Sequence, residues 1–252
     1  MIITSWLVKR SRSAERGVNA SEFADRNARS SALYLAVYAV TFSLASVDWL
    51  MALEPMWFST IWGVYQFAGM IQAALAVIVI LGISLSAPGQ PLHGVFRTEH
   101  LHDLGKLIVG FSCFWMYIWF SQYMLIWYSN IPEETSYFLS RTHGPWGPVV
   151  LASIVLNWLV PFLVLLPRPA KRSVRVMIRV AIVILIGRWV DLWIMVMPST
   201  LAGKPPVIGV WEVATMLCTG AAAFLLLHRA FRHAEPVPQN DPFLSESMRY
   251  HA

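Results

Sequence analysis

Long apolar stretches separated by short polar segments dominate the pattern of hydrophobic and polar positions. Each stretch is long enough to cross about 30 Å of hydrocarbon as a helix. They cover residues 32–51, 58–85, 105–128, 149–166, 176–197 and 208–227. The pattern predicts an all-α, polytopic membrane helix bundle with about six transmembrane helices. Residues 32–228 form its membrane domain, with a basic N-terminal segment at 1–31 and a tail at 229–252.

Two junctions between apolar stretches gather Trp, Tyr, Met and acidic residues. Residues 47–70 join the first two stretches through an expected short connection at 52–57, with Asp48 and Glu54 at the hydrocarbon edge. Residues 119–135 repeat this composition after the third stretch. Because Trp and Tyr favour membrane–water boundaries, we interpret this shared layer as the working side of the protein.

The N-terminal segment carries two weaker signals. Asn19, followed three residues later by Glu22, is typical of the start of a surface helix. The apolar stub MIITSWL at residues 1–7 precedes the basic residues, which is the reverse of a signal peptide. It is typical of the last turns of a helix, so we expect the chain to be the C-terminal part of a longer subunit.

Composition and charge place these helices in a bilayer. The 252 residues are 57% hydrophobic and 13% charged, with a mean hydropathy of +0.56. The N-terminal segment, 86–106, 167–175 and the C-terminal tail hold 15 Lys and Arg, whereas the opposite loops hold only two. The positive-inside rule therefore predicts that both termini are cytoplasmic. The basic residues flank spans rather than forming a stripe, which argues against nucleic-acid binding.

Metal and haem ligands are scarce in the sequence. The two cysteines, Cys113 and Cys218, are isolated in apolar stretches, and no His lies in the middle of a span. Disulfide, zinc, iron–sulfur and bis-His haem sites therefore lack ligands. We expect the chain to bind no cofactor of its own. Expressed alone, it should show no haem absorbance.

Charged residues inside spans are the strongest functional candidates because they are costly in hydrocarbon. Arg188 and Asp191 lie three apart on one helical face and can form an ion pair. Asp48, Gln122 and Glu212 fall at a similar depth, and we expect Asp48 and Glu212 to converge on the pair. The pair is either a structural lock or part of a proton-relay or quinone-side cluster. The candidates are Asp48, Glu54, Gln122, Arg188, Asp191 and Glu212.

A second polar group opens the third stretch on the predicted cytoplasmic side. It comprises His100, His102, Asp103 and Lys106. A proton-entry site and a solvated helix start both fit this pattern. Between the two polar layers we expect interhelical hydrogen bonds from Gln66, Gln72, Ser112 and Asn157.

Three segments resemble a known family. They are DWLMALEPMWFSTIWGVYQFAGM, HLHDLGKLIVGFSCFWMYIWFSQYMLIWYSNIPEET and RWVDLWIMVMP. They are similar to NrfD/PsrC-type membrane subunits, and most to the ActF-type subunit of bacterial alternative complex III, over residues 1–233. Family members have about ten spans, so the six expected here match the C-terminal part: a four-helix bundle plus two further helices.

The resemblance implies a quinol:cytochrome c or other acceptor oxidoreductase, in which this subunit supports quinol oxidation and proton translocation. It implies quinone or quinol as a ligand, and membrane lipid, a sister NrfD-like subunit, an iron–sulfur subunit and haem c subunits as partners. Two alternatives stay open from the residues. A secondary transporter or channel would use the same charges for a proton or an anion. A purely structural membrane anchor would hold peripheral redox subunits.

Overall fold

The computed structural model describes residues 20–201, 204–233, 237 and 244–249, and its regular elements over these residues are all helical. The N-terminal stub and Asn19 lie outside the described residues. Six helical segments are long and apolar enough to cross a membrane. The predicted fold class is therefore confirmed.

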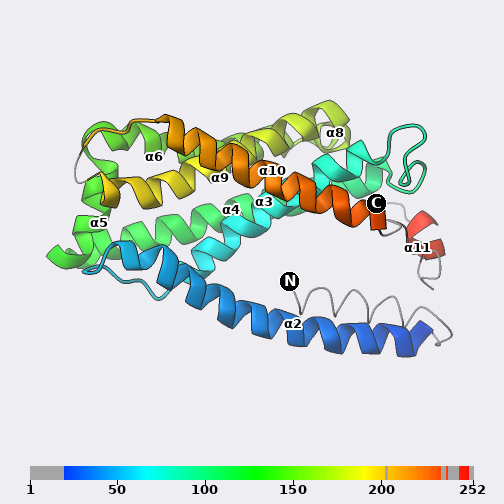
Figure 1. Cartoon of the computed structure of the whole chain (residues 1–252), viewed down its shortest axis with the longest axis horizontal. Coiled ribbons are helices and arrows are strands. Elements are labelled where there is room, and N and C mark those ends of the chain that lie inside the picture. The colour runs from blue at the N-terminus through cyan, green and yellow to red at the C-terminus, as the bar shows by residue number, and fades with distance from the viewer. Residues whose placement is uncertain (1–19, 202–203, 234–236, 238–243, 250–252) are drawn as a thin grey trace.

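Four of these segments form the central bundle. They are α3 (Trp62–Ser84), α4 (Thr98–Ser129), the broken fourth span and α9 (Val174–Thr200). Helix α3 packs against both α4 and α9, and the fourth span fills the remaining side against α4 and α9. Figure 1 shows these helices running together between an end marked by α5 (Pro132–Thr142) and an end marked by α8 (Arg168–Arg172).

The fourth span is built from several short elements. They are η2 (Gly144–Trp146), α6 (Gly147–Ile154), a π-helical turn η3 (Val155–Leu159) and α7 (Val160–Leu165). Pro161 has no N–H to offer the carbonyl of Asn157, and the Gln72 amide of α3 donates to that oxygen at 2.5 Å. The break is thus satisfied by a neighbouring helix, as hydrocarbon surroundings require.

Two further spans lie outside this bundle. Helix α2 (Ala20–Trp49) packs on α3 near the α5 end and diverges from the bundle toward Ala20 (Figure 1). Helix α10 (Val210–His233) has no buried residue in its most apolar stretch. The short helix α11 (Leu244–Arg249) follows in the tail. The result is four packed spans plus two peripheral ones.

Element boundaries differ from the sequence prediction in three places. Helix α2 continues from Ala20 past residue 31, because no Gly or Pro interrupts it there. The first connection is longer than 52–57: α2 ends at Trp49, a turn η1 (Met51–Leu53) follows, and α3 starts at Trp62. Glu54 precedes a proline, which disfavours helix at that position. Helix α4 begins at Thr98, so the predicted polar group is itself helical.

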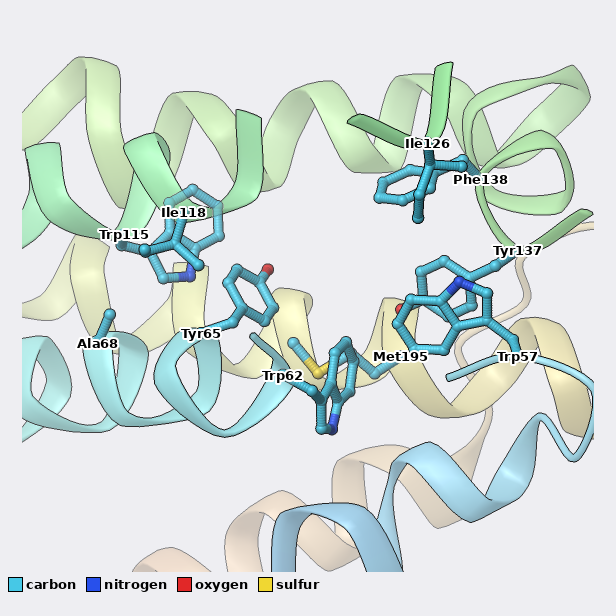
Figure 2. Close-up of a cluster of buried hydrophobic side chains, with 10 residues drawn as sticks. All are labelled: Trp57, Trp62, Tyr65, Ala68, Trp115, Ile118, Ile126, Tyr137, Phe138 and Met195. Carbon is cyan, nitrogen blue, oxygen red and sulfur yellow. The ribbon is translucent and has the colours of Figure 1, made fainter. Parts of the chain in front are cut away.

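The buried core has two halves of different character. Toward α8 it is aliphatic, built from residues such as Leu75, Ile108 and Ile184. Toward α5 it is aromatic, and Figure 2 shows its members, with the ring of Tyr137 against Trp57 at 3.8 Å between centroids. The ion pairs formed by Arg188 and by Glu54 lie in or beside this aromatic half.

Candidate functional site

Arg188 and Asp191 on α9 form the predicted ion pair. Arg188 Nη1 lies 2.5 Å from Asp191 Oδ2, and the two side chains are only 12% and 5% exposed. Three residues of separation put both on one face of α9. A pair this deeply buried requires further hydrogen bonds to the remaining donors and acceptors.

Helix α3 supplies those bonds from two adjacent residues. The Tyr65 hydroxyl donates to Asp191 Oδ1 at 2.6 Å, and Arg188 Nη2 donates to Gln66 Oε1 at 2.7 Å. Each charged group therefore has a partner on its own helix and one across the interface. We call Tyr65, Gln66, Arg188 and Asp191 the Asp191 cluster.

A glycine on α3 makes room for this cluster. A Cβ atom at Gly69 would lie 2.5 Å from Arg188 Nη1 and 2.9 Å from its Cζ. Gly69 stands three residues after Gln66, one turn further along α3. The guanidinium can reach Gln66 only because that turn carries no side chain.

A second buried cluster lies nearer the end of the bundle, around Arg141 of α5. Its side chain is 3% exposed, and its Nη2 lies 3.0 Å from Oε1 of Glu54, which is 29% exposed. Ser199 of α9 also donates to Glu54 Oε1, at 2.8 Å. The Arg141 guanidinium stacks over the Tyr137 ring at 3.8 Å. We call Glu54, Tyr137, Arg141 and Ser199 the Arg141 cluster.

Pro198 explains why Arg141 is needed at this position. Pro198 lies inside α9 and has no N–H for the carbonyl of Ile194, four residues earlier. Arg141 Nε donates to that oxygen at 3.2 Å, and Nη2 donates to the carbonyl of Met195 at 3.2 Å. The arginine of α5 thus replaces a backbone donor missing from α9.

A small cavity is lined by members of both clusters. Its polar lining includes Tyr65 and Asp191 from one cluster, Tyr137 and Arg141 from the other, and Gln122 of α4. The volume is about 30 Å³, enough for one or two water molecules but far below the roughly 150 Å³ that holds a benzene ring. The Gln122 amide nitrogen is buried and has no hydrogen-bond partner among the described residues. A donor left open beside water-sized space suits a bound water.

The Tyr137 phenol stays protonated beside this cavity. Burial raises the pKa of Tyr137 to about 12, against a smaller lowering by the Arg141 guanidinium. At neutral pH its hydroxyl is therefore a neutral donor and acceptor. Hydroxyls of this kind can pass a proton along a hydrogen-bonded chain without becoming charged themselves.

Asp48 and Glu212 do not join the site. The prediction that they converge on the Arg188–Asp191 pair is therefore wrong. Asp48 is exposed on α2, the helix that diverges from the bundle, and it has no ion-pair or hydrogen-bond partner among the described residues. Glu212 caps its own helix instead: Oε2 accepts from the Gly209 N–H at 2.8 Å. Acidic side chains are favoured at helix N-termini, which explains this local role.

The other outer candidates are placed near the pair. Gln122 lines the cavity with Asp191, as the depth argument suggested. Glu54 pairs with Arg141 rather than with Arg188. The predicted contact between Arg188 and Asp191 is confirmed. Its role in proton transfer stays a prediction.

The group at the start of α4 divides into separate local roles. Lys106 Nζ lies 2.5 Å from Asp103 Oδ1, but the lysine side chain is 53% exposed, so this pair contributes little to stability. His100 Nδ1 accepts from the Arg97 N–H at 3.2 Å and helps cap the helix. His102 is buried, and its Nδ1 has no hydrogen-bond partner in the part of the chain that the structure describes. Of the four, His102 alone faces the core.

The predicted interhelical hydrogen bonds are confirmed for Gln66, Gln72 and Ser112, whereas the Asn157 side chain bonds within its own span. Gln72 donates to Ser112 Oγ at 2.8 Å as well as to the Asn157 carbonyl. The Asn157 amide donates to Ser153 on its own span at 3.0 Å. Gln66 also bonds across the interface, in the Asp191 cluster. These contacts fix α3 against α4 and the fourth span.

Sequence reasoning missed Tyr65, Tyr137 and Arg141 as site residues. In the sequence, Tyr65 stands out only as a member of the aromatic layer and Arg141 only as a loop charge, and Tyr137 lies beyond the second junction at 119–135. One signal was available: a proline in the last turns of a span leaves a carbonyl that another group must satisfy. Pro198 therefore called for an external donor near that end of α9.

The described residues place no three His, Cys, Asp or Glu side chains where they could hold a metal ion. Both cysteines are free thiols. The fold and the site define a multi-pass membrane protein whose central bundle encloses a buried ionisable cluster beside a water-sized cavity. No protein-family model matches the chain, and no curated protein sequence matches it.

Proposed function

We propose that the chain is a membrane subunit of a respiratory quinol:acceptor oxidoreductase of the alternative complex III type, in which the Asp191 cluster carries protons. The observation that carries the proposal is a desolvated carboxylate bonded to Arg188 and Tyr65 at the edge of a cavity with room for water. Ionisable residues inside membranes are the usual components of proton relays. The cavity is too small for a quinone ring, so the cluster itself handles protons rather than quinol.

The three segments that resemble the NrfD/PsrC-type subunits support this proposal. They lie far apart in sequence, yet each contributes to the same cavity: Tyr65 comes from the first, Gln122 from the second and Asp191 from the third. Electrons would travel through iron–sulfur and haem c groups of partner subunits. In this arrangement the chain sits in the bacterial cytoplasmic membrane with the α5 end outside and both termini inside.

The route has an outer end in the Arg141 cluster. Tyr137 lines the cavity and belongs to that cluster, and Glu54 beside it is partly exposed. A proton leaving Asp191 through cavity water would meet the Tyr137 hydroxyl and then the Glu54 carboxylate. Arg141 holds that carboxylate in place through the 3.0 Å contact between Nη2 and Oε1.

Purification from native membranes tests the assignment first. Iron–sulfur and haem c proteins should co-purify with the chain. A preparation containing only copies of this chain would favour a transporter and would refute the respiratory assignment.

Conservative substitutions then test the proton role. Tyr65→Phe removes one hydroxyl and leaves the Arg188–Asp191 pair intact, whereas Asp191→Asn removes the titratable group. Both should lower quinol-dependent acceptor reduction or proton yield by tenfold or more, at normal complex abundance for Tyr65→Phe. Asp48→Asn is the matched control, because Asp48 lies outside the cluster and its loss should change neither. Normal turnover and proton yield in Tyr65→Phe and Asp191→Asn would leave the cluster as a structural lock.

A further inference from the structure

A larger cavity lies beside the site, between the last turns of α4 and helix α5. Its volume is about 320 Å³, and its lining includes Tyr123, Trp127, Asn130, Phe138, Thr142 and His143. This volume is within the range of small-molecule sites. Phe138 and Thr142 also line the water-sized cavity, so the two spaces share a wall. We call this larger space the α4–α5 groove.

Aromatic side chains give the groove firm, flat walls. Tyr123 stacks on Trp119 at 5.6 Å between centroids and 5° between planes, and Phe138 packs edge-on against Tyr123 at 5.3 Å. Both contacts hold the Tyr123 ring in place. Trp127 is exposed at the mouth, as is usual for Trp at a membrane boundary. Walls of this kind suit a planar apolar ring arriving from the lipid.

Polar groups gather at one edge of the same groove, and their hydrogen bonds fix the His143 tautomer. The Thr142 hydroxyl donates to the Phe138 carbonyl at 2.7 Å, so toward His143 it can only accept. Its oxygen lies 3.1 Å from His143 Nδ1, which therefore carries the hydrogen. In the neutral imidazole, His143 Nε2 then has the lone pair, which can accept a hydrogen bond from a hydroxyl group.

We propose that the α4–α5 groove binds the hydroxyl-bearing ring of a quinol, with His143 Nε2 accepting a hydrogen bond from one hydroxyl. This inference rests on the proposed respiratory function and assigns its quinol to a place on this chain. A lipid acyl chain would use the aromatic walls but would leave the His143 and Asn130 edge without a partner. The shared wall at Thr142 puts the ring next to the Asp191 cavity.

Photolabelling of membranes that contain the full chain tests the groove. The label is a short-chain azido-naphthoquinone, and the competitors are the matching naphthoquinol and its dimethyl ether, which lacks hydroxyl hydrogens. Label should attach within residues 123–143. Quinol should compete about three- to tenfold better than the ether, the contribution of one hydrogen bond. His143→Ala should remove this preference without removing the label.

Steric blocking provides a second, independent variant. Leu139→Trp fills the groove and should abolish labelling, whereas Leu125→Trp, on the exposed surface of α4 outside the groove, should leave it unchanged. If Leu139→Trp fails to accumulate in membranes, the His143→Ala preference decides. Label outside 123–143, or equal competition by quinol, ether and excess phospholipid, means apolar partition only and overturns the proposal.

The same membranes separate the two claims. Labelling in the groove together with normal turnover and normal proton yield in Asp191→Asn would remove the proton role and keep the binding site. Loss of turnover in Asp191→Asn without groove labelling would keep the proton role and remove the binding site.

Discussion

Arg141 supplies the hydrogen bond to the Ile194 carbonyl that Pro198 cannot donate, and this replacement allows a quantitative prediction. Arg141→Met keeps the length of the side chain but removes its donors, so the Ile194 carbonyl loses a charged partner and Glu54 loses its counter-ion. A hydrogen bond to a charged group contributes about 1.5–3 kcal/mol, and breaking a buried ion pair costs about 3–5 kcal/mol. Because Glu54 is 29% exposed, solvent offsets part of the loss, and we expect about 3 kcal/mol in total.

Pro198→Ala supplies the missing backbone N–H from within α9. In that background the Ile194 carbonyl no longer depends on Arg141, so Arg141→Met should cost about 1 kcal/mol less than in the native chain. The double-mutant cycle therefore has a coupling energy of about 1 kcal/mol, above the additivity error of about 0.3–0.5 kcal/mol. Additive effects, or a larger cost in the Pro198→Ala background, would refute this role of Arg141.

Unfolding in mixed detergent and denaturing surfactant, followed by tryptophan fluorescence, measures these free energies. Arg179→Met is the matched control because this arginine is exposed on α9, the helix that contains Pro198. Its loss should change the free energy of unfolding by less than about 0.5 kcal/mol.

Two further predictions follow from the packing and the charge pattern. Gly69→Ala should displace the Arg188 guanidinium, cost about 2 kcal/mol of unfolding free energy and lower turnover. Gly110→Ala meets open space inside α4, so it should not lower the unfolding free energy, because a helix interior favours Ala over Gly by about 1 kcal/mol. An unchanged melting temperature for Gly69→Ala would show that Arg188 has room to move. Cysteine labelling after Gly144 should report the outside and after Lys171 the inside. The opposite labelling would reverse the topology and the direction of the proposed proton route.

Local features of the candidate site could be predicted from the sequence. Arg188 and Asp191 lie three apart on one helix, so their pairing depends on helical geometry alone. The six spans follow in the same way from the length of each apolar stretch and the thickness of hydrocarbon. Gln66 and Gln72 had to find partners across helices, because neither lipid nor apolar side chains can satisfy an amide.

Contacts between distant segments could not be predicted, and Asp48 and Glu212 show why. Equal depth in the membrane does not bring them together, because α2 diverges from the bundle and Glu212 caps the start of its own helix, α10. Which face of a span points inward depends on the rotation of each helix about its axis. Spans that are apolar on all sides do not encode this rotation in their pattern, since lipid and protein core are equally apolar.

The sequence by itself determined an all-α membrane protein, its six spans, its charge asymmetry and the local Arg188–Asp191 pair. Tertiary structure decided that Tyr65 bonds Asp191, that Arg141 serves the proline of another helix, and that two cavities share the wall at Phe138 and Thr142. These features join residues from separate spans, and only the close packing of α3, α4, α5 and α9 brings their side chains within hydrogen-bonding distance.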